Sequence, residues 1–181
     1  MAVWNNDDLV LYHGCTEQSL LGTNPNGIAV GTLPHRISLT AGGRRTEFGR
    51  GFYATSRIDQ AKNWAHLQAR KLAAKTLSKT TPNAVVLRFD VSRNKLADLE
   101  ALVFTNENCG FWPFVAYCRS GSVPHGRSTG RQMEYDIVYG PVSIWPQRLV
   151  IKDCDQVSFH TVTALNVIPA LSVAITGNPY F

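Results

Sequence analysis

One segment limits what this chain can fold into: residues 58–77, IDQAKNWAHLQARKLAAKTL, place apolar side chains at the spacing of one helix face. The S-x-x-D pattern at 56–59 has the form of a capping box, and TTPN at 80–83 ends the helical pattern. Strand-like sequence lies on both sides, GFYAT at 51–55 and the β-branched AVVLRFDV at 84–91. The chain therefore combines one long helix with β-structure.

Strand patterns outnumber helical ones in the rest of the sequence. We expect strands in DLVLYHG (8–14), in MEYDIVYGPVSIW with a break at Gly140-Pro141, in QVSFHT (156–161) and in the closing LSVAIT. Helical segments are expected after Ser92, in the second half of 107–121 and in TALNVIPAL. Because helices and strands do not alternate regularly, the fold class is predicted to be α+β.

Size and composition indicate a single globular domain spanning residues 1–181. Apolar residues make up 44% and charged residues 17%, as in ordinary folded proteins. No apolar run approaches the roughly 20 residues of a membrane helix, and the N-terminus MAVWNNDDLV lacks signal-peptide features. We therefore expect a cytoplasmic protein that does not contact membranes.

The four cysteines do not indicate a metal or disulfide site. Cys15, Cys109, Cys118 and Cys154 are scattered, with no C-x-x-C pair. We predict reduced and mostly buried thiols, and no metal cofactor.

Positive charge is concentrated around one part of the sequence. The net charge is +5, and the cluster consists of Arg44, Arg45, Arg50, Arg57, Lys62, Arg70, Lys71, Lys75 and Lys79. Such a cluster would suit a phosphate-bearing ligand or nucleic acid, and it would equally suit the solvated face of a helix. The long Gly- and Pro-rich stretch at 22–46 has the length of a functional loop.

The stretch FGRGFYATS (48–56) lies inside this basic region. Gly49 and Gly51 flank Arg50, and Tyr53 follows two residues later. Two interpretations remain open: a tight turn into a strand, or a backbone pressed closely against a ligand.

Four blocks of the sequence, taken in order, resemble the PARP/diphtheria-toxin-like ADP-ribosyltransferases. They are YHG (12–14), FGRGFYAT followed by QAKNWA, YDIVYGPV (135–142) and DQVSFHT (155–161), and they fit a group of small bacterial and phage-type members. The similarity spans about residues 9–168. It implies a split antiparallel β-sheet with flanking helices, and NAD as co-substrate.

The resemblance also implies roles for individual residues. His13 would hydrogen-bond the adenosine ribose and the Gly14 backbone would hold the carboxamide of NAD. Tyr53 and Trp64 would stack on the nicotinamide ring. Arg50 would reach the pyrophosphate, unless it pairs with a carboxylate, and Gly51 would let the chain bend around the ligand.

The third catalytic position departs from the family pattern. Where most active members carry glutamate, this chain has Gln156. An amide binds a ribose hydroxyl but lacks the negative charge that stabilises the oxocarbenium-like sugar formed when NAD is cleaved. Glu134 and Asp136 are candidates for a compensating carboxylate, and Gln156→Glu is expected to raise NAD hydrolysis.

Together these features predict a mono-ADP-ribosyltransferase that modifies nucleic acid or protein, with His13, Tyr53 and Gln156 as catalytic residues. A toxin or defence role, with an inhibitor protein as a further partner, follows by family analogy. The alternative is a degenerate transferase fold that binds NAD, ADP-ribose or nucleic acid without turnover. A metal-independent nuclease using His13 and His160 is a third hypothesis.

Overall fold

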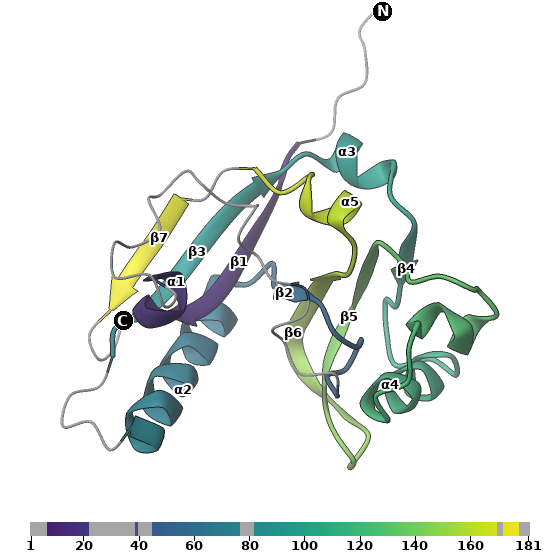
Figure 1. Cartoon of the computed structure of the whole chain (residues 1–181), viewed down its shortest axis with the longest axis horizontal. Coiled ribbons are helices and arrows are strands. Elements are labelled where there is room, and N and C mark those ends of the chain that lie inside the picture. Colours follow the sequence, from purple (N-terminus) through teal and green to yellow (C-terminus); the bar gives the residue numbers. More distant parts are fainter. Residues whose placement is uncertain (1–6, 22–38, 40–44, 77–81, 170–171, 178–181) are drawn as a thin grey trace, which may run out of the picture. The chain divides into compact units, whose positions relative to one another are not determined.

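The structure is a computed structural model that describes residues 7–21, 39, 45–76, 82–169 and 172–177 (backbone only for 20–21, 76 and 172–176). It contains two β-sheets and several helices, so the predicted α+β class is confirmed (Figure 1). The elements are β1 (Leu9–Thr16), α1 (Glu17–Leu21), β2 (Phe52–Ala54), α2 (Ile58–Thr76), β3 (Ala84–Val91), α3 (Arg93–Ala97), β4 (Ala101–Val103), α4 (Phe111–Arg119), the 3-10 helix η1 (His125–Thr129), β5 (Ile137–Ile144), β6 (Leu149–Phe159), α5 (Val162–Leu165) and β7 (Ser172–Gly177).

These elements group into two compact units, each assembled from separate stretches of chain. The first unit comprises residues 1–7, 37–53 and 92–167, and the second comprises 8–36, 54–91 and 168–181. The expectation of one domain over 1–181 stays a prediction.

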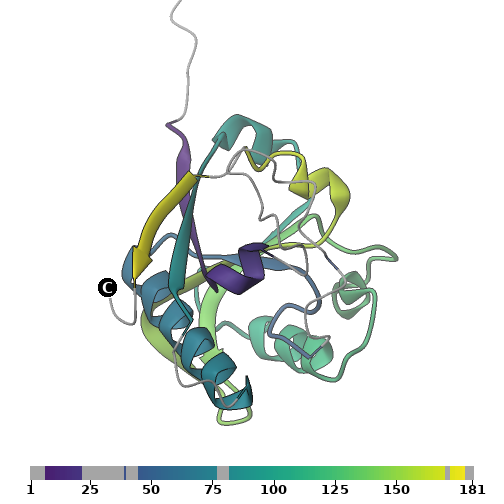
Figure 2. The ribbon, with the colours of Figure 1, turned by 60° about the vertical axis from the view of Figure 1, so that its left-hand side comes forward.

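The second unit contains an antiparallel sheet in the order β1-β3-β7. β1 pairs with β3 from Leu9↔Val91 to Thr16↔Ala84. The first four residues of β3 are buried on both faces of the strand, while its second half alternates between buried and exposed positions. This pattern fits a central strand that is covered by another element at one end. That element is α2, which lies along β1 and β3 (Figure 2).

Small residues form the buried face of α2. Ala61, Ala65 and Ala69 are almost completely buried at helical spacing. Trp64, which the sequence pattern placed near this face, is instead 51% exposed. Alanines let the helix axis come close to the sheet, and the bulky indole is left on the neighbouring face.

Gly14 is required by this close approach. A Cβ atom at Gly14 would lie 2.1 Å from the Ala61 carbonyl oxygen and 2.9 Å from the Ala65 nitrogen. Both are backbone atoms of α2, so neither can move away without displacing the helix. Helix packing alone therefore explains this glycine.

The first unit contains a four-stranded sheet in the order β2-β6-β5-β4. β5 and β6 are antiparallel, but β4 runs parallel to β5, so the expectation of a purely antiparallel sheet is wrong for this edge. The predicted strand break at Gly140-Pro141 is also wrong. β5 continues through it, with a shift of register between Pro141 and Ser143 that accommodates the proline.

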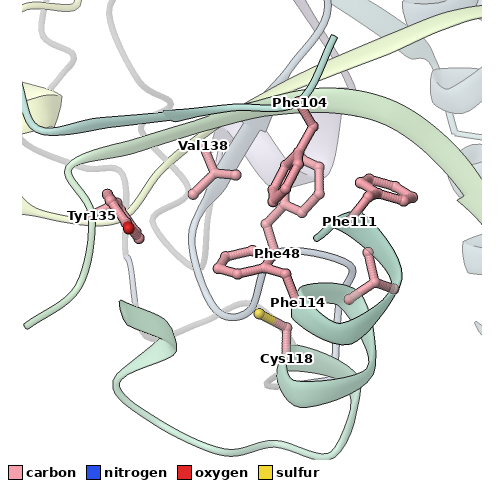
Figure 3. Close-up of a cluster of buried hydrophobic side chains, with 8 residues drawn as sticks. Phe48, Phe104, Phe111, Phe114, Cys118, Tyr135 and Val138 are labelled. Atoms are coloured by element: carbon pink, nitrogen blue, oxygen red, sulfur yellow. The ribbon is translucent and has the colours of Figure 1, made fainter. Parts of the chain in front are cut away.

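An aromatic cluster forms the core of the first unit (Figure 3). Phe48, Phe104, Phe111 and Phe114 are all at most 5% exposed, with ring centroids 5.4–6.4 Å apart. α4 carries two of these rings, and its first turn is closed by Asn108, whose side-chain oxygen accepts from the Phe111 backbone N–H. Phe48 is thus the residue that anchors the FGRGFY segment.

β3 and the helix after Ser92, whose hydroxyl caps α3, are confirmed. The Gly- and Ser-rich segment 121–131 contains η1. Most of the 22–46 loop lies outside the described residues. Within the described part of the chain, no helix has the length and apolar character of a membrane span.

We predict that Gly14→Ala lowers the free energy of unfolding by about 2 to 3 kcal/mol, because the new methyl group overlaps the backbone of α2. Urea denaturation measures this. Gly110→Ala is the matched control: its Cβ would meet no atom closer than 3.5 Å, so the change should stay within about 1 kcal/mol. Equal effects at the two positions would contradict the packing described for Gly14.

Candidate functional site

A pocket of about 400 Å³ opens in the second unit, within the size range of small-molecule sites. The C-terminal half of β1 supplies His13, Gly14, Cys15 and Thr16, and α1 supplies Ser19. The opposite side is α2, which contributes Trp64, Gln68, Lys71, Leu72 and Lys75. Three residues predicted to bind NAD, His13, Gly14 and Trp64, therefore lie together.

The helical side of the pocket combines an aromatic face with positive charge. Trp64, Gln68, Lys71 and Lys75 follow one another at helical spacing. The Lys71 ammonium lies 5.8 Å from the centroid of the Trp64 ring, a cation–π arrangement. This surface suits a flat ring joined to an anionic group.

The GRG turn, Gly49–Gly51, requires its two glycines because of packing within the first unit. Gly49 has φ +85°, a conformation that side chains other than glycine rarely adopt. A Cβ at Gly51 would lie 2.7 Å from both His160 Nδ1 and the Phe159 carbonyl oxygen. The turn is therefore pressed against the end of β6, and this contact requires glycine without any ligand.

Tyr53 fastens the same turn through its hydroxyl. This group accepts from the Phe48 backbone N–H (3.1 Å) and donates to the Gly49 carbonyl (2.6 Å). The Tyr53 ring stacks on that of Phe48, with centroids 6.5 Å apart. Burial raises the pKa of the phenol, so Tyr53 stays protonated at neutral pH. Its chemistry is limited to stacking and hydrogen bonding.

Two buried histidines, His160 and His125, lie next to one another beside the turn. His160 Nδ1 donates to the Arg50 carbonyl at 2.8 Å, and its Nε2 lies 2.8 Å from Ser158 Oγ. The His125 ring lies edge-on, 4.4 Å away between centroids. Burial, together with His125, lowers the pKa of His160 to about 4. His160 is thus a neutral residue with both ring nitrogens engaged in contacts within the protein.

Glu134 and Asp136 are occupied by structural contacts. Glu134 lies 2.7 Å from His125 Nδ1 and accepts from the His125 backbone N–H. Burial alone would raise the pKa of Glu134, but the hydrogen bonds from His125 hold it below its usual value. Asp136 accepts from the Glu100 backbone N–H and from the Thr161 hydroxyl. Both carboxylates are thus held by neighbouring groups of the fold.

Gln156 is instead paired with a carboxylate that sequence reasoning missed. Its Nε2 donates to Glu47 Oε2 at 2.8 Å and to the Pro141 carbonyl at 3.1 Å. Both Gln156 and Glu47 are 7% exposed. Glu47 stands immediately before the FGRGFY motif, and no periodicity marks it as buried. The burial of Glu47 depends on the pairing of segments that are distant in sequence, so no local signal predicts it.

Arg50 Nε is buried and has no hydrogen-bond partner among the described residues, so no carboxylate pairs with this atom there. Burial raises the pKa of the Cys15 and Cys118 thiols to about 12, which makes both unreactive. All four cysteines are free thiols, and Cys109 is exposed. The described residues include no group of three or more side chains that could hold a metal ion.

The predicted site residues thus fall into separate local structures. His13, Gly14 and Trp64 line the pocket of the second unit. Arg50 and Gly51 belong to the GRG turn of the first unit, and Tyr53 follows on β2. Gln156 lies with Glu47 in that same unit.

The comparison with known families accounts for the middle of the chain. Residues 33–143, more than half of the 181, match the family described as "Protein of unknown function (DUF3990)", and the chain belongs to that family. The match includes Glu47, the GRG turn and Trp64, but neither His13 nor Gln156. A search of curated proteins gives no match.

We predict that the protein loses stability between about pH 6.5 and about pH 4 because His160 remains neutral in the folded state while its unfolded counterpart takes up a proton. The free energy of unfolding should fall by up to about 1.4 kcal/mol per pH unit, or about 3 kcal/mol in total. Urea denaturation over this pH range measures it.

His160→Gln should be less stable than wild type near neutral pH and should have a flatter pH dependence. His66→Gln, on α2, is the control and should keep the wild-type slope. A wild-type slope in His160→Gln would contradict the assignment of the buried neutral group.

Proposed function

We propose that this protein is an NAD-dependent mono-ADP-ribosyltransferase that acts on a nucleic acid or a protein. The observation that carries the proposal is the pocket of the second unit, which brings His13 together with an aromatic ring and two lysines. A nucleotide presents the complementary groups: a flat base, a ribose with hydroxyls and a diphosphate.

The charges of the pocket favour the adenylate half of NAD. Lys71 and Lys75 would attract the diphosphate, whereas the cationic nicotinamide would be repelled by an ammonium group beside Trp64. Trp64 is thereby assigned to the adenine ring instead of the nicotinamide ring. His13 keeps its expected role of hydrogen-bonding the adenosine ribose.

Residues of the first unit are assigned to the chemistry at the nicotinamide ribose. Tyr53 offers a ring whose hydroxyl is already held by the turn, which supports a stacking role. Arg50 has a buried Nε without a partner among the described residues, which suits contact with an anion. Gln156 uses its Nε2 within the protein, so Oε1 is the atom assigned to a ribose hydroxyl.

The division of the strands into a three-stranded and a four-stranded sheet supports the finer fold assignment. We assign the chain to the split-sheet ADP-ribosyltransferase fold, and the four sequence blocks support the same assignment. A cytoplasmic toxin or defence effector, controlled by an inhibitor protein, remains the biological role proposed by analogy.

A second candidate is a binding module without turnover. The presence of glutamine at position 156, already hydrogen-bonded inside the protein, favours it. The two candidates differ in one measurable respect: a binding module is stabilised by NAD but releases no nicotinamide.

NAD labelled on its adenylate phosphate, incubated with the protein and a whole-cell extract, tests the proposal. Label on macromolecules that is released by nuclease identifies a nucleic-acid acceptor, and label released by protease identifies a protein acceptor. Binding of NAD without any consumption would replace the transferase by the binding module.

We predict that Trp64→Ala weakens NAD binding by about 5- to 30-fold, since one stacking partner is worth roughly 1–2 kcal/mol. Trp64 is half exposed, so the substitution should leave folding intact, which thermal denaturation verifies. Isothermal titration calorimetry measures the affinity. Leu67→Ala, a 40%-exposed residue on the same helix outside the pocket lining, is the control and should bind NAD like wild type. Equal affinity of the Trp64 variant and the control would remove Trp64 from the site.

A further inference from the structure

Glu47 is a buried acidic group without a positive partner in the described part of the chain. Its side chain is 7% exposed, and among the described residues no lysine, arginine or histidine forms an ion pair with it. Burying a lone charge is costly, so its retention calls for strong hydrogen bonds or a functional reason.

Hydrogen-bond donors hold both carboxylate oxygens of Glu47. Oε1 accepts from the Ser143 backbone N–H, and Oε2 accepts from Gln156 Nε2. The Ser143 donor lies immediately after the register shift of β5, which directs this N–H away from the regular ladder. The β5 bulge therefore supplies one of the hydrogen bonds that hold the Glu47 carboxylate.

The carboxylate fixes the orientation of the Gln156 amide. A carboxylate only accepts, so the group facing it must be the NH₂ of Gln156. The second hydrogen of that NH₂ goes to the Pro141 carbonyl. Both hydrogens are then used within the protein, and the amide oxygen alone is left to meet a substrate hydroxyl.

We infer that Glu47 is a positioning residue for NAD cleavage: it holds Gln156 with its oxygen toward the ribose and supplies the negative charge that the amide lacks. The inference rests on the proposed function. The hydrogen bond from Nε2 to the carboxylate polarises the amide and increases the negative charge on its oxygen. Because Glu47 is buried, its charge is weakly screened and also favours a developing sugar cation that meets the Gln156 oxygen.

This arrangement reverses the expectation for Gln156→Glu. The new carboxylate would stand where Nε2 now lies 2.8 Å from Glu47, and two carboxyl groups at such a distance share one proton. The variant is therefore expected to lose activity as the pH rises and that proton leaves, and Glu47→Gln in the same chain should relieve the repulsion.

The experiment is a double-mutant cycle of Glu47→Gln, Gln156→Glu and their combination, with NAD hydrolysis followed as nicotinamide release. We expect Glu47→Gln to lower kcat by about 10- to 100-fold while KM for NAD changes by less than about threefold. The combined variant should recover about tenfold over Glu47→Gln, because one charge is restored to the pair. Gln156→Glu alone should lose kcat between about pH 6 and about pH 8, and the combined variant should not.

Glu107→Gln, at an exposed position, is the control for a simple change of charge and should match wild type. Thermal denaturation of each variant separates misfolding from loss of chemistry. If the wild type turns over NAD and Glu47→Gln has the same kcat, the inference is overturned. A combined variant that is no better than the worse single variant would also overturn it. Neither result would remove the proposed function. Absence of nicotinamide release by the wild type would instead remove the proposed function, and the inference with it.

Discussion

The contact between the His160 ring and the Arg50 carbonyl fixes the part of the first unit on which the other interactions depend. This hydrogen bond holds the GRG turn on the end of β6, while Phe48 secures the preceding residue in the aromatic core. The Tyr53 hydroxyl also holds the turn, because it donates to the Gly49 carbonyl. Glu47, one residue before Phe48, reaches Gln156 only because its neighbours are held in this way. The buried neutral state of His160 is therefore coupled to the geometry of the candidate site.

The glycines of the chain show how one sequence signal serves two purposes. Gly14 and Gly51 were expected to allow a ligand close to the backbone, and packing against α2 and His160 already demands glycine at both positions. A tight contact inside the protein does not exclude a ligand on the other side. It does mean that these glycines carry no independent argument for NAD, whereas the side chains lining the pocket do.

Elements with strong local patterns could be predicted from the sequence. β3, α2 and the cap of α3 at Ser92 were found at or within a residue of their expected bounds, because β-branched runs and capping residues act locally. The continuity of β5 through Pro141 could not be predicted, since it depends on pairing with β6. The exposure of Trp64 could not be predicted for a similar reason: only the packing of α2 on β1 decides which face of the helix is buried. The hydrogen bond between Glu47 and Gln156 joins residues that are far apart in sequence, and no local pattern at either residue predicts it.

The central proposal is a nucleotide site in the pocket that β1 and α2 line. The most direct test is a crystal structure of the protein grown with NAD. We predict electron density for the adenine ring against Trp64 and for the diphosphate within reach of Lys71 and Lys75. An empty pocket with NAD bound at another surface would contradict the account.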